Sequence, residues 1–233
     1  MSKNLIFRQL IDFESFTYTY ILGCAKTRNA VIIDPVFEQA KRDAKLAKEL
    51  DLNLIYGLNT HVHADHITGT SKLKEFFPAM KSGLSGKSGG VADKLLKQGD
   101  LLQIGDIELE VAETPGHTDG CLTFISHQLR AAFTGDALLI RGCGRTDFQQ
   151  GSSRALYQSV HQKILDVLPE DYRILVGHNY EGILESTVGE EIKFNPRIMK
   201  SEEEFVKIMS ELKLAHPKQI QQALPANLKD GDI

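Results

Sequence analysis

Several features that mark other protein classes are scarce or missing in this sequence of 233 residues. It has only three cysteines, Cys24, Cys121 and Cys143, far apart in the chain, which argues against a disulfide framework and for a reducing compartment. No apolar run approaches the ~20 residues that a membrane-spanning helix needs. Lys and Arg total 27 against 31 Asp and Glu, so the net charge of −4 gives no basic footprint for nucleic acid. We therefore expect neither nucleic acid nor membrane as a partner.

The chain also lacks a short-period repeat and a long low-complexity linker. With 42% hydrophobic residues it has enough apolar material for a core, so a single domain over 1–233 is expected. The first residues lead directly into a strand-like pattern, which predicts no targeting peptide and a cytoplasmic location. Two strand-rich halves, each followed by helices, predict an α+β fold: a sandwich of two mixed sheets with helices on the outer faces (αββα). Residues 187–233 would form a helical extension packed on it.

Hydrophobic periodicity and turn residues define the expected elements. Helices are predicted over 38–50, 68–77 and 153–165. The Gly- and Ser-rich stretch 82–90 is predicted to be a loop. Capping-box sequences at 187–190 and 201–204 predict that two helices close the chain. Strands are predicted at 5–10, 18–23, 30–34, 54–59, 101–104, 107–112, 121–126, 130–133 and 173–176.

The densest group of polar side chains is the segment THVHADH at 60–66, with three imidazoles and one carboxylate in six consecutive residues. It follows an apolar run that is typical of a buried strand, and loops after strands commonly carry function. His61 and His63 point to the same side in an extended chain, and Asp65 and His66 follow as the chain turns. Imidazole nitrogen and carboxylate oxygen suit borderline metals, so the segment predicts a metal site.

Three more residues repeat an order of strand, turn and ligand-type side chain. His117 follows a Pro-Gly turn, and Asp136 and His178 each follow a glycine. Each alone is typical of an ordinary turn or core residue, but the recurrence indicates one site built from several strand ends. The other histidines lack this context and are not expected to bind metal: His127, His161 and His216.

THVHADH together with these three residues resembles the ligand pattern of the metallo-β-lactamase superfamily, whose αββα sandwich is the fold expected above. A second motif, RGCGRTDFQQG at 141–151, resembles the segment after the metal-binding Asp of persulfide dioxygenases, the ethylmalonic encephalopathy protein family. The likeness continues through 156–161, 195–197 and 203–209 to Pro225-Ala226-Asn227. It therefore covers nearly the whole chain.

This resemblance implies an enzyme with one Fe(II) per chain that oxidises glutathione persulfide with O2 and water to sulfite and glutathione. His61, His117 and Asp136 would hold the iron and leave positions open for substrate and O2. Family members commonly pair, which implies a homodimer for which the C-terminal helices offer a surface. Four further residues would orient the ligands and hold water: His63, Asp65, His66 and His178.

Substrate contacts follow from the chemistry of glutathione, whose two carboxylates call for a cationic group. Arg145 is the candidate; its alternative role is an ion pair with Asp147 that shapes the loop. Tyr180 is expected either to offer its hydroxyl to the substrate or O2, or to pack over the mouth of the site. Asn179 stands where the family often has Asp, which replaces a charged acceptor with a neutral amide.

Two other functions remain open from the residues themselves. The seven ligand-type side chains would suit two metals, as in a glyoxalase II-like thioesterase that hydrolyses glutathione thioesters with metal-bound hydroxide. The third function is a metal-binding or sensor domain without activity, for which the intact 141–151 motif would be needless. Metal content and O2 uptake distinguish the dioxygenase from the thioesterase, and absence of turnover with any persulfide or thioester after iron reconstitution would favour the third function.

Overall fold

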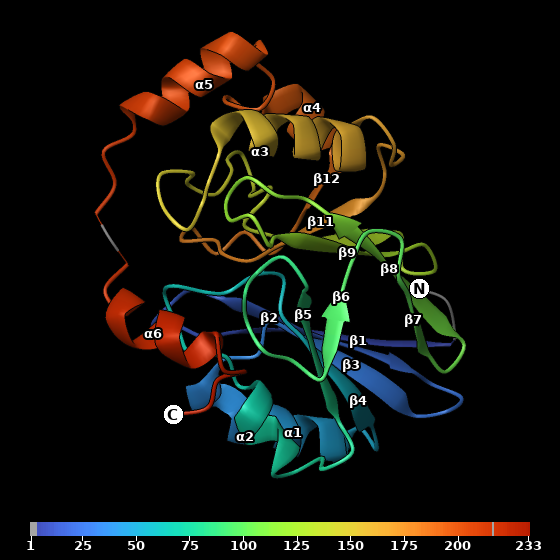
Figure 1. Ribbon diagram of the computed structural model, residues 1–233. Coiled ribbons are helices and arrows are strands. Elements are labelled where there is room, and N and C mark those ends of the chain that lie inside the picture. Colours follow the sequence, from blue (N-terminus) through green and yellow to red (C-terminus); the bar gives the residue numbers. More distant parts are fainter. Residues whose placement is uncertain (1–3, 216) are drawn as a thin grey trace.

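Two six-stranded β-sheets stacked on each other form the centre of the computed structural model, with helices on both outer faces (Figure 1). The structure describes residues 4–215 and 217–233, so His216 lies outside the described residues. The first half of the chain builds one sheet and the second half builds the other. The predicted α+β sandwich of two mixed sheets is confirmed.

In the first sheet the strands lie in chain order. The first three pair antiparallel, and the third to sixth pair parallel. Two helices cover its outer face (Figure 1). The elements are β1 (Leu5–Ile11), β2 (Tyr18–Cys24), β3 (Asn29–Ile33), η1 (Phe37–Gln39), α1 (Ala40–Glu49), β4 (Asn53–Leu58), α2 (Thr70–Lys74), β5 (Lys81–Ser85) and β6 (Lys94–Leu96).

The second sheet also keeps chain order, and all its neighbours are antiparallel except one parallel pair, β10 and β11. Its strands are β7 (Leu101–Ile104), β8 (Ile107–Glu113), β9 (Leu122–Ser126), β10 (Ala131–Gly135), β11 (Arg173–Val176) and β12 (Ser186–Thr187). The helices of this half are α3 (Ser153–Val160), continued by the π-helical turn η2 (His161–Leu165), then α4 (Val188–Phe194), α5 (Glu202–Glu211) and α6 (Ile220–Asn227).

The central strands are buried on both faces, which explains their nearly continuous apolar sequences. Along β2, Leu22 belongs to the core between the two sheets, whereas its neighbour Ile21 packs in the smaller core under α1. The same alternation occurs in β3 with Val31 and Ile32, because successive strand residues point to opposite faces. The layered order of helix, sheet, sheet and helix therefore rests on two cores.

The prediction of a loop over 82–90 is wrong for its first part. Residues Lys81–Ser85 form β5, which lies between β4 and β6. A methyl group at Gly83 would lie 2.6 Å from Leu58 Cδ2, so this strand needs a small residue for close packing. The small residues that resemble a flexible loop are thus needed for tight packing of the strand.

Two helix predictions also need correction. The helix expected over 68–77 is the shorter α2, which begins after Gly69. Two helices were expected to close the chain, but α6 is a third, which contains Pro225 and has no side-chain cap, so the usual start and stop signals are missing. Thr187 and Ser201 cap α4 and α5 as expected, although only Ser201 forms the reciprocal box with Glu204.

The three C-terminal helices divide between the two layers. Helices α4 and α5 lie on the α3 side of the second sheet, and α6 lies beside the first sheet (Figure 1). That 1–233 form a single domain with 187–233 packed on it stays our proposal, which the shared core between the sheets supports. Among the described residues, no helix is both long enough and apolar enough to cross a membrane.

Candidate metal centre

The histidine loop and three shorter turns meet where strand ends of both sheets converge. The loop at 61–66 follows β4, His117 follows β8, Asp136 follows β10 and His178 follows β11. The rings of His61 and His117 lie edge to face with centroids 4.9 Å apart. All seven ligand-type residues predicted from the sequence therefore gather in one place, although they come from four separate segments.

One group matches the predicted iron ligands. Ligand atoms of His61, His117 and Asp136 all lie within 4.8 Å of one another. His117 Nε2 is 3.7 Å from Asp136 Oδ2, too long for a hydrogen bond. Asp136 Oδ1 is buried and has no hydrogen-bond partner among the described residues. Buried oxygen and nitrogen atoms that converge without bonding to one another fit a cation between them.

Hydrogen bonds fix the tautomers of both histidines. Thr60 Oγ1 donates to Asp34 Oδ2 (2.9 Å) and therefore accepts from His61 Nδ1 (3.0 Å). His117 Nδ1 donates to the backbone carbonyl of Arg145 (2.6 Å). Both rings thus keep an unprotonated Nε2, which is the form that binds metal.

The pKa shifts of His61 and Asp136 favour the protonation states that bind metal. Burial lowers the pKa of His61 well below its usual value, so the ring is neutral at pH 7. Burial alone would raise the pKa of Asp136, but the imidazoles of His178 and His117 outweigh it and lower this pKa. Neutral imidazole and ionised carboxylate are the protonation states that a metal requires.

A second group lies beside the first. Ligand atoms of His63, Asp65 and His178 also lie within 4.8 Å of one another. His63 Nε2 donates to Asp34 Oδ1 (3.1 Å), which leaves His63 Nδ1 buried without a partner in the part of the chain that the structure describes. Burial opposes ionisation of Asp65, yet the pKa of its carboxyl lies well below the usual value because His178 and His66 outweigh that effect.

His66 and His178 are held by the neighbouring loop. His66 Nδ1 lies 3.0 Å from Asp65 Oδ2 and 3.2 Å from Thr17 Oγ1, while its buried Nε2 has no partner within 4–215 and 217–233. His178 Nδ1 donates to the carbonyl of Ser15 (3.2 Å). This second group is equipped either to bind another ion or to orient the first ligand set and its water.

The two predicted substrate residues differ in what they contact. Arg145 makes a bidentate ion pair with Asp147 (2.7 Å for each bond) and donates to the carbonyls of Leu214 and Ala215. Its guanidinium group is therefore engaged in the loop-shaping role that was the alternative to substrate binding. Tyr180 is 70% exposed and lies at the edge of the centre. Its ring is parallel to that of His178, with the two ring centroids 6.3 Å apart.

Asn179 has a local structural role. Its Oδ1 accepts hydrogen bonds from the backbone N–H groups of Glu181 and Ile183 (3.0 and 2.8 Å). An amide oxygen accepts these bonds as a carboxylate would, so the turn after His178 keeps its shape without the negative charge.

Sequence reasoning missed residues that shape the centre without being ligands. A methyl group at Gly144 would lie 2.9 Å from His117 Nδ1, and one at Gly177 would lie 2.5 Å from Asp136 Oδ1. Asp34 was interpreted only as the end of a strand, although it receives hydrogen bonds from both Thr60 and His63. The glycine signal was visible in the motifs; the role of Asp34 was not, because it comes from a separate segment.

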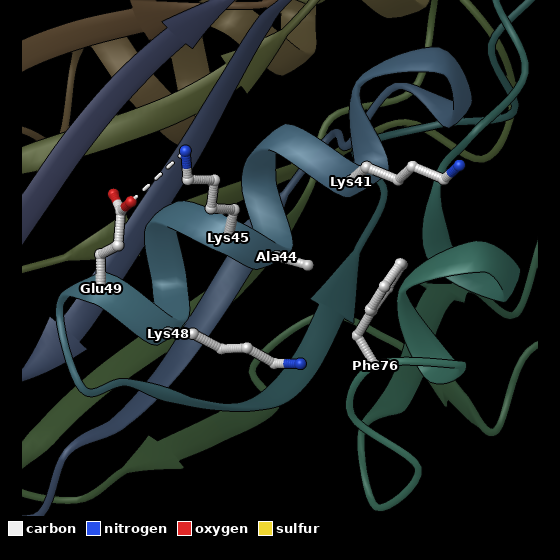
Figure 2. Close-up of a pocket in the computed structure, with 6 residues that line it drawn as sticks. All are labelled: Lys41, Ala44, Lys45, Lys48, Glu49 and Phe76. Atoms are coloured by element: carbon white, nitrogen blue, oxygen red, sulfur yellow. Dashed lines mark ion pairs between the residues drawn. The ribbon is translucent and has the colours of Figure 1, made fainter.

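Two cavities lie near the surface. One of about 330 Å3 adjoins the centre, and its lining includes no Lys or Arg: Val62, Ser88, Thr118, Asp119, Gln149, Gln150, Leu224 and Leu228. Another, of about 450 Å3, lies on α1 away from the histidines, where Lys48 Nζ approaches the Phe76 ring (5.4 Å) and Lys45 faces Glu49 (Figure 2). The first is next to the metal-ligand loops and the second is not.

Comparisons with known proteins agree with this arrangement. A sequence profile of the metallo-β-lactamase superfamily matches residues 13–87 and 80–178. The chain is 52% identical to "Persulfide dioxygenase ETHE1, mitochondrial" of Homo sapiens, over 97% of this chain and 89% of that protein. The chain belongs to the persulfide dioxygenase family of the metallo-β-lactamase superfamily.

A solved structure and a curated hydrolase are also similar to this chain, to different degrees. The crystal structure of ETHE1 from Myxococcus xanthus superposes with a TM-score of 0.93 at 44% identity, covering 97% of this chain and 99% of that one. "Hydroxyacylglutathione hydrolase GloC" of Haemophilus influenzae is 35% identical over 81% of this chain and 96% of its own length. The persulfide dioxygenase family thus shares more sequence with this chain than that hydrolase does.

Proposed function

We propose that this protein is an Fe(II)-dependent persulfide dioxygenase that oxidises glutathione persulfide with O2 and water to sulfite and glutathione. The observation that carries the proposal is the three-residue set of two imidazoles and one carboxylate within a member of the persulfide dioxygenase family. Bound Fe(II) would supply the redox chemistry that d10 zinc lacks, with open positions for the persulfide sulfur and O2.

The protein side chains would bind and orient. His61, His117 and Asp136 would hold the iron, since their ligand atoms lie within 4.8 Å of one another. The carbonyl of Arg145 and the hydroxyl of Thr60 keep the histidine rings in the ligand tautomer. Overall, the outer sulfur loses four electrons to O2, and water supplies the third oxygen of sulfite.

Replacing a ligand tests the assignment directly. His61→Ala, His117→Ala and Asp136→Ala should each abolish iron binding and O2 uptake, because two remaining ligands cannot retain the ion. His127→Ala is the control, because this exposed histidine pairs with Tyr172 and Glu110 outside the centre. A ligand variant with full iron occupancy would show that the assignment is wrong.

A dinuclear thioesterase is the second candidate, and the group His63, Asp65 and His178 is the observation that favours it. The Haemophilus influenzae relative is named a hydroxyacylglutathione hydrolase, which agrees with such a use of the fold. Elemental analysis combined with oxygen consumption on adding glutathione persulfide separates the two. One iron per chain with O2 uptake and sulfite supports the dioxygenase; two zinc ions with thioester hydrolysis and no O2 uptake supports the thioesterase.

Location and assembly belong to the same proposal. We place the protein in the cytoplasm because its three cysteines are all free and buried, as in a reducing compartment. Three mammalian relatives are named as mitochondrial, so fractionation of source cells is the test. A homodimer through the C-terminal helices stays a prediction, which light scattering of the purified protein checks.

A further inference from the structure

A single side chain joins the C-terminal helix α6 to the histidine loop. Asn227, the last residue of α6, is only 4% exposed although it is polar. Its Nδ2 donates to the carbonyls of His63 (2.9 Å) and His66 (2.8 Å). Its Oδ1 accepts from the backbone N–H of Thr68 (2.8 Å). Both amide hydrogens and the amide oxygen are therefore used on one loop, more than 150 residues away in the sequence.

The loop needs such an external partner. Residues 61–67 form neither helix nor strand, so no ladder or helical turn satisfies their backbone groups. Buried carbonyls without a partner are unfavourable, and a loop that carries them is free to shift. The side chains of His63 and His66 start from the same residues that Asn227 binds. Fixing these carbonyls consequently fixes where the rings begin.

The tail after α6 fits the same segment independently of Asn227. Gly231 has a φ of +79°, and a methyl group there would lie 2.4 Å from the carbonyl oxygen of Thr68. Ser71 Oγ donates to the carbonyl of Gly231 (2.7 Å), and Lys74 pairs with Asp230 (2.6 Å). These contacts hold the tail on α2.

We propose that Asn227 is a positioning residue for the metal centre, which sets the geometry of the histidine loop from the C-terminus of the chain. It contacts the backbone of the histidine loop and acts on the metal only through the histidines of that loop. This inference rests on the metal centre of the proposed function. It assigns a role to the last element of the chain, which carries none of the ligand-type residues.

Asn227→Asp is the sharpest variant, because it keeps the size and the acceptor for Thr68 but removes both donor hydrogens. Ser71→Ala is the matched control, since it removes a bond to the same tail without touching the loop carbonyls. In an anaerobic Fe(II) titration against a competing chelator, Asn227→Asp should bind ~10-fold more weakly, in the range for residues that orient ligands. The visible spectrum of the Co(II)-loaded variant should shift as well.

Ser71→Ala should retain wild-type Fe(II) affinity and the wild-type Co(II) spectrum. A purely structural role for Asn227 would lower the melting temperature and leave both metal readouts unchanged. A folded Asn227→Asp protein with wild-type affinity and spectrum therefore overturns the inference.

Amide hydrogen exchange tests the same coupling in the wild-type protein, should the variant not fold. Coupling between two sites is reciprocal, so loading Fe(II) should slow exchange over 224–231 as well as over 61–68. Slower exchange confined to 61–68 contradicts the inference. Failure of the proposed function shows differently: the wild-type chain then consumes no O2 with glutathione persulfide, and the Co(II) spectra still decide the role of Asn227.

Discussion

Replacing Asp34 with Asn tests whether one buried carboxylate sets the tautomers of the metal centre. Asp34 follows β3, is 1% exposed, and uses Oδ1 to accept from the Thr60 N–H (2.7 Å) and from His63 Nε2 (3.1 Å). Its Oδ2 accepts from the Thr60 hydroxyl (2.9 Å). That hydroxyl therefore has a lone pair, not a proton, for His61 Nδ1, and His61 Nε2 stays free for a metal.

Asparagine cannot reproduce this pattern because it has one acceptor oxygen and one NH2 group. The oxygen has to stay at the Oδ1 position, where two donors meet, so the NH2 group faces the Thr60 hydroxyl. The hydroxyl must then turn its proton toward His61 Nδ1. The imidazole proton moves to Nε2, the nitrogen that faces the other ligands, and this tautomer does not bind metal.

The size of the effect follows from the two roles of Asp34. Losing a group that orients a metal ligand weakens metal binding ~10–100-fold, or about 1.4–2.7 kcal/mol. The free energy of unfolding of the apoprotein should change less than the free energy of metal binding. Weaker hydrogen bonds cost about 1–3 kcal/mol, but burial raises the pKa of Asp34, so removing this buried charge offsets part of that cost. The expected net change in the free energy of unfolding is within about 1 kcal/mol.

Competition titration of Fe(II) and urea unfolding of the apoprotein measure the two quantities separately. Asp43→Asn is the control for the Fe(II) titration, since Asp43 is also a buried carboxylate but lies in α1, away from the centre. An Asp34→Asn protein that folds and binds Fe(II) as tightly as the wild type would refute the tautomer argument.

Three further predictions concern other parts of the chain. Gly144→Ala should lower Fe(II) affinity and the free energy of unfolding by about 1–3 kcal/mol, because the new methyl group overlaps the metal centre; Gly142→Ala, with only one atom as near as 4.0 Å, should change neither. Burial raises the pKa of Asp43 to about 6, so Asp43→Asn should raise the free energy of unfolding at pH 7 by about 2 kcal/mol and by little at pH 4. Arg145→Ala and Asp147→Asn should both lower the melting temperature and kcat, since the pair shapes one loop.

The sign of the pH effect follows from proton linkage. The native state binds the Asp43 proton more tightly than the unfolded chain does, so wild-type stability falls as the pH rises from about 4 to about 6. Above that range the penalty is complete. Urea unfolding of the wild type and of Asp43→Asn at pH 4 and pH 7 checks this sign. An equal difference in the free energy of unfolding at the two pH values would contradict a raised pKa for Asp43.

The loop predictions have equally clear contrary results. Wild-type Fe(II) affinity in Gly144→Ala would mean that the loop moves without disturbing His117. A rise in the KM for glutathione persulfide in Arg145→Ala, with Asp147→Asn unchanged, would show that Arg145 binds the substrate after all.

The sequence by itself determined the layers of the fold and the members of the candidate metal centre. Strand periodicity, turn residues and caps are local signals, and they predicted most of the strands and the caps of α4 and α5. The ligands were visible for the same reason. Metal chemistry restricts the residue types at 61–66, 117, 136 and 178, and each follows a strand that the pattern identifies.

Tertiary structure alone decided what holds those ligands. Asp34 determines a tautomer through Thr60, Gly144 makes room for a histidine ring, and Asn227 binds loop carbonyls from the far end of the chain. None of these roles has a local signature, because each acts through a hydrogen bond or close contact between segments distant in sequence. The same reason hid β5 and α6: Gly83 and Pro225 read as breakers locally, and packing against distant segments outweighs that preference.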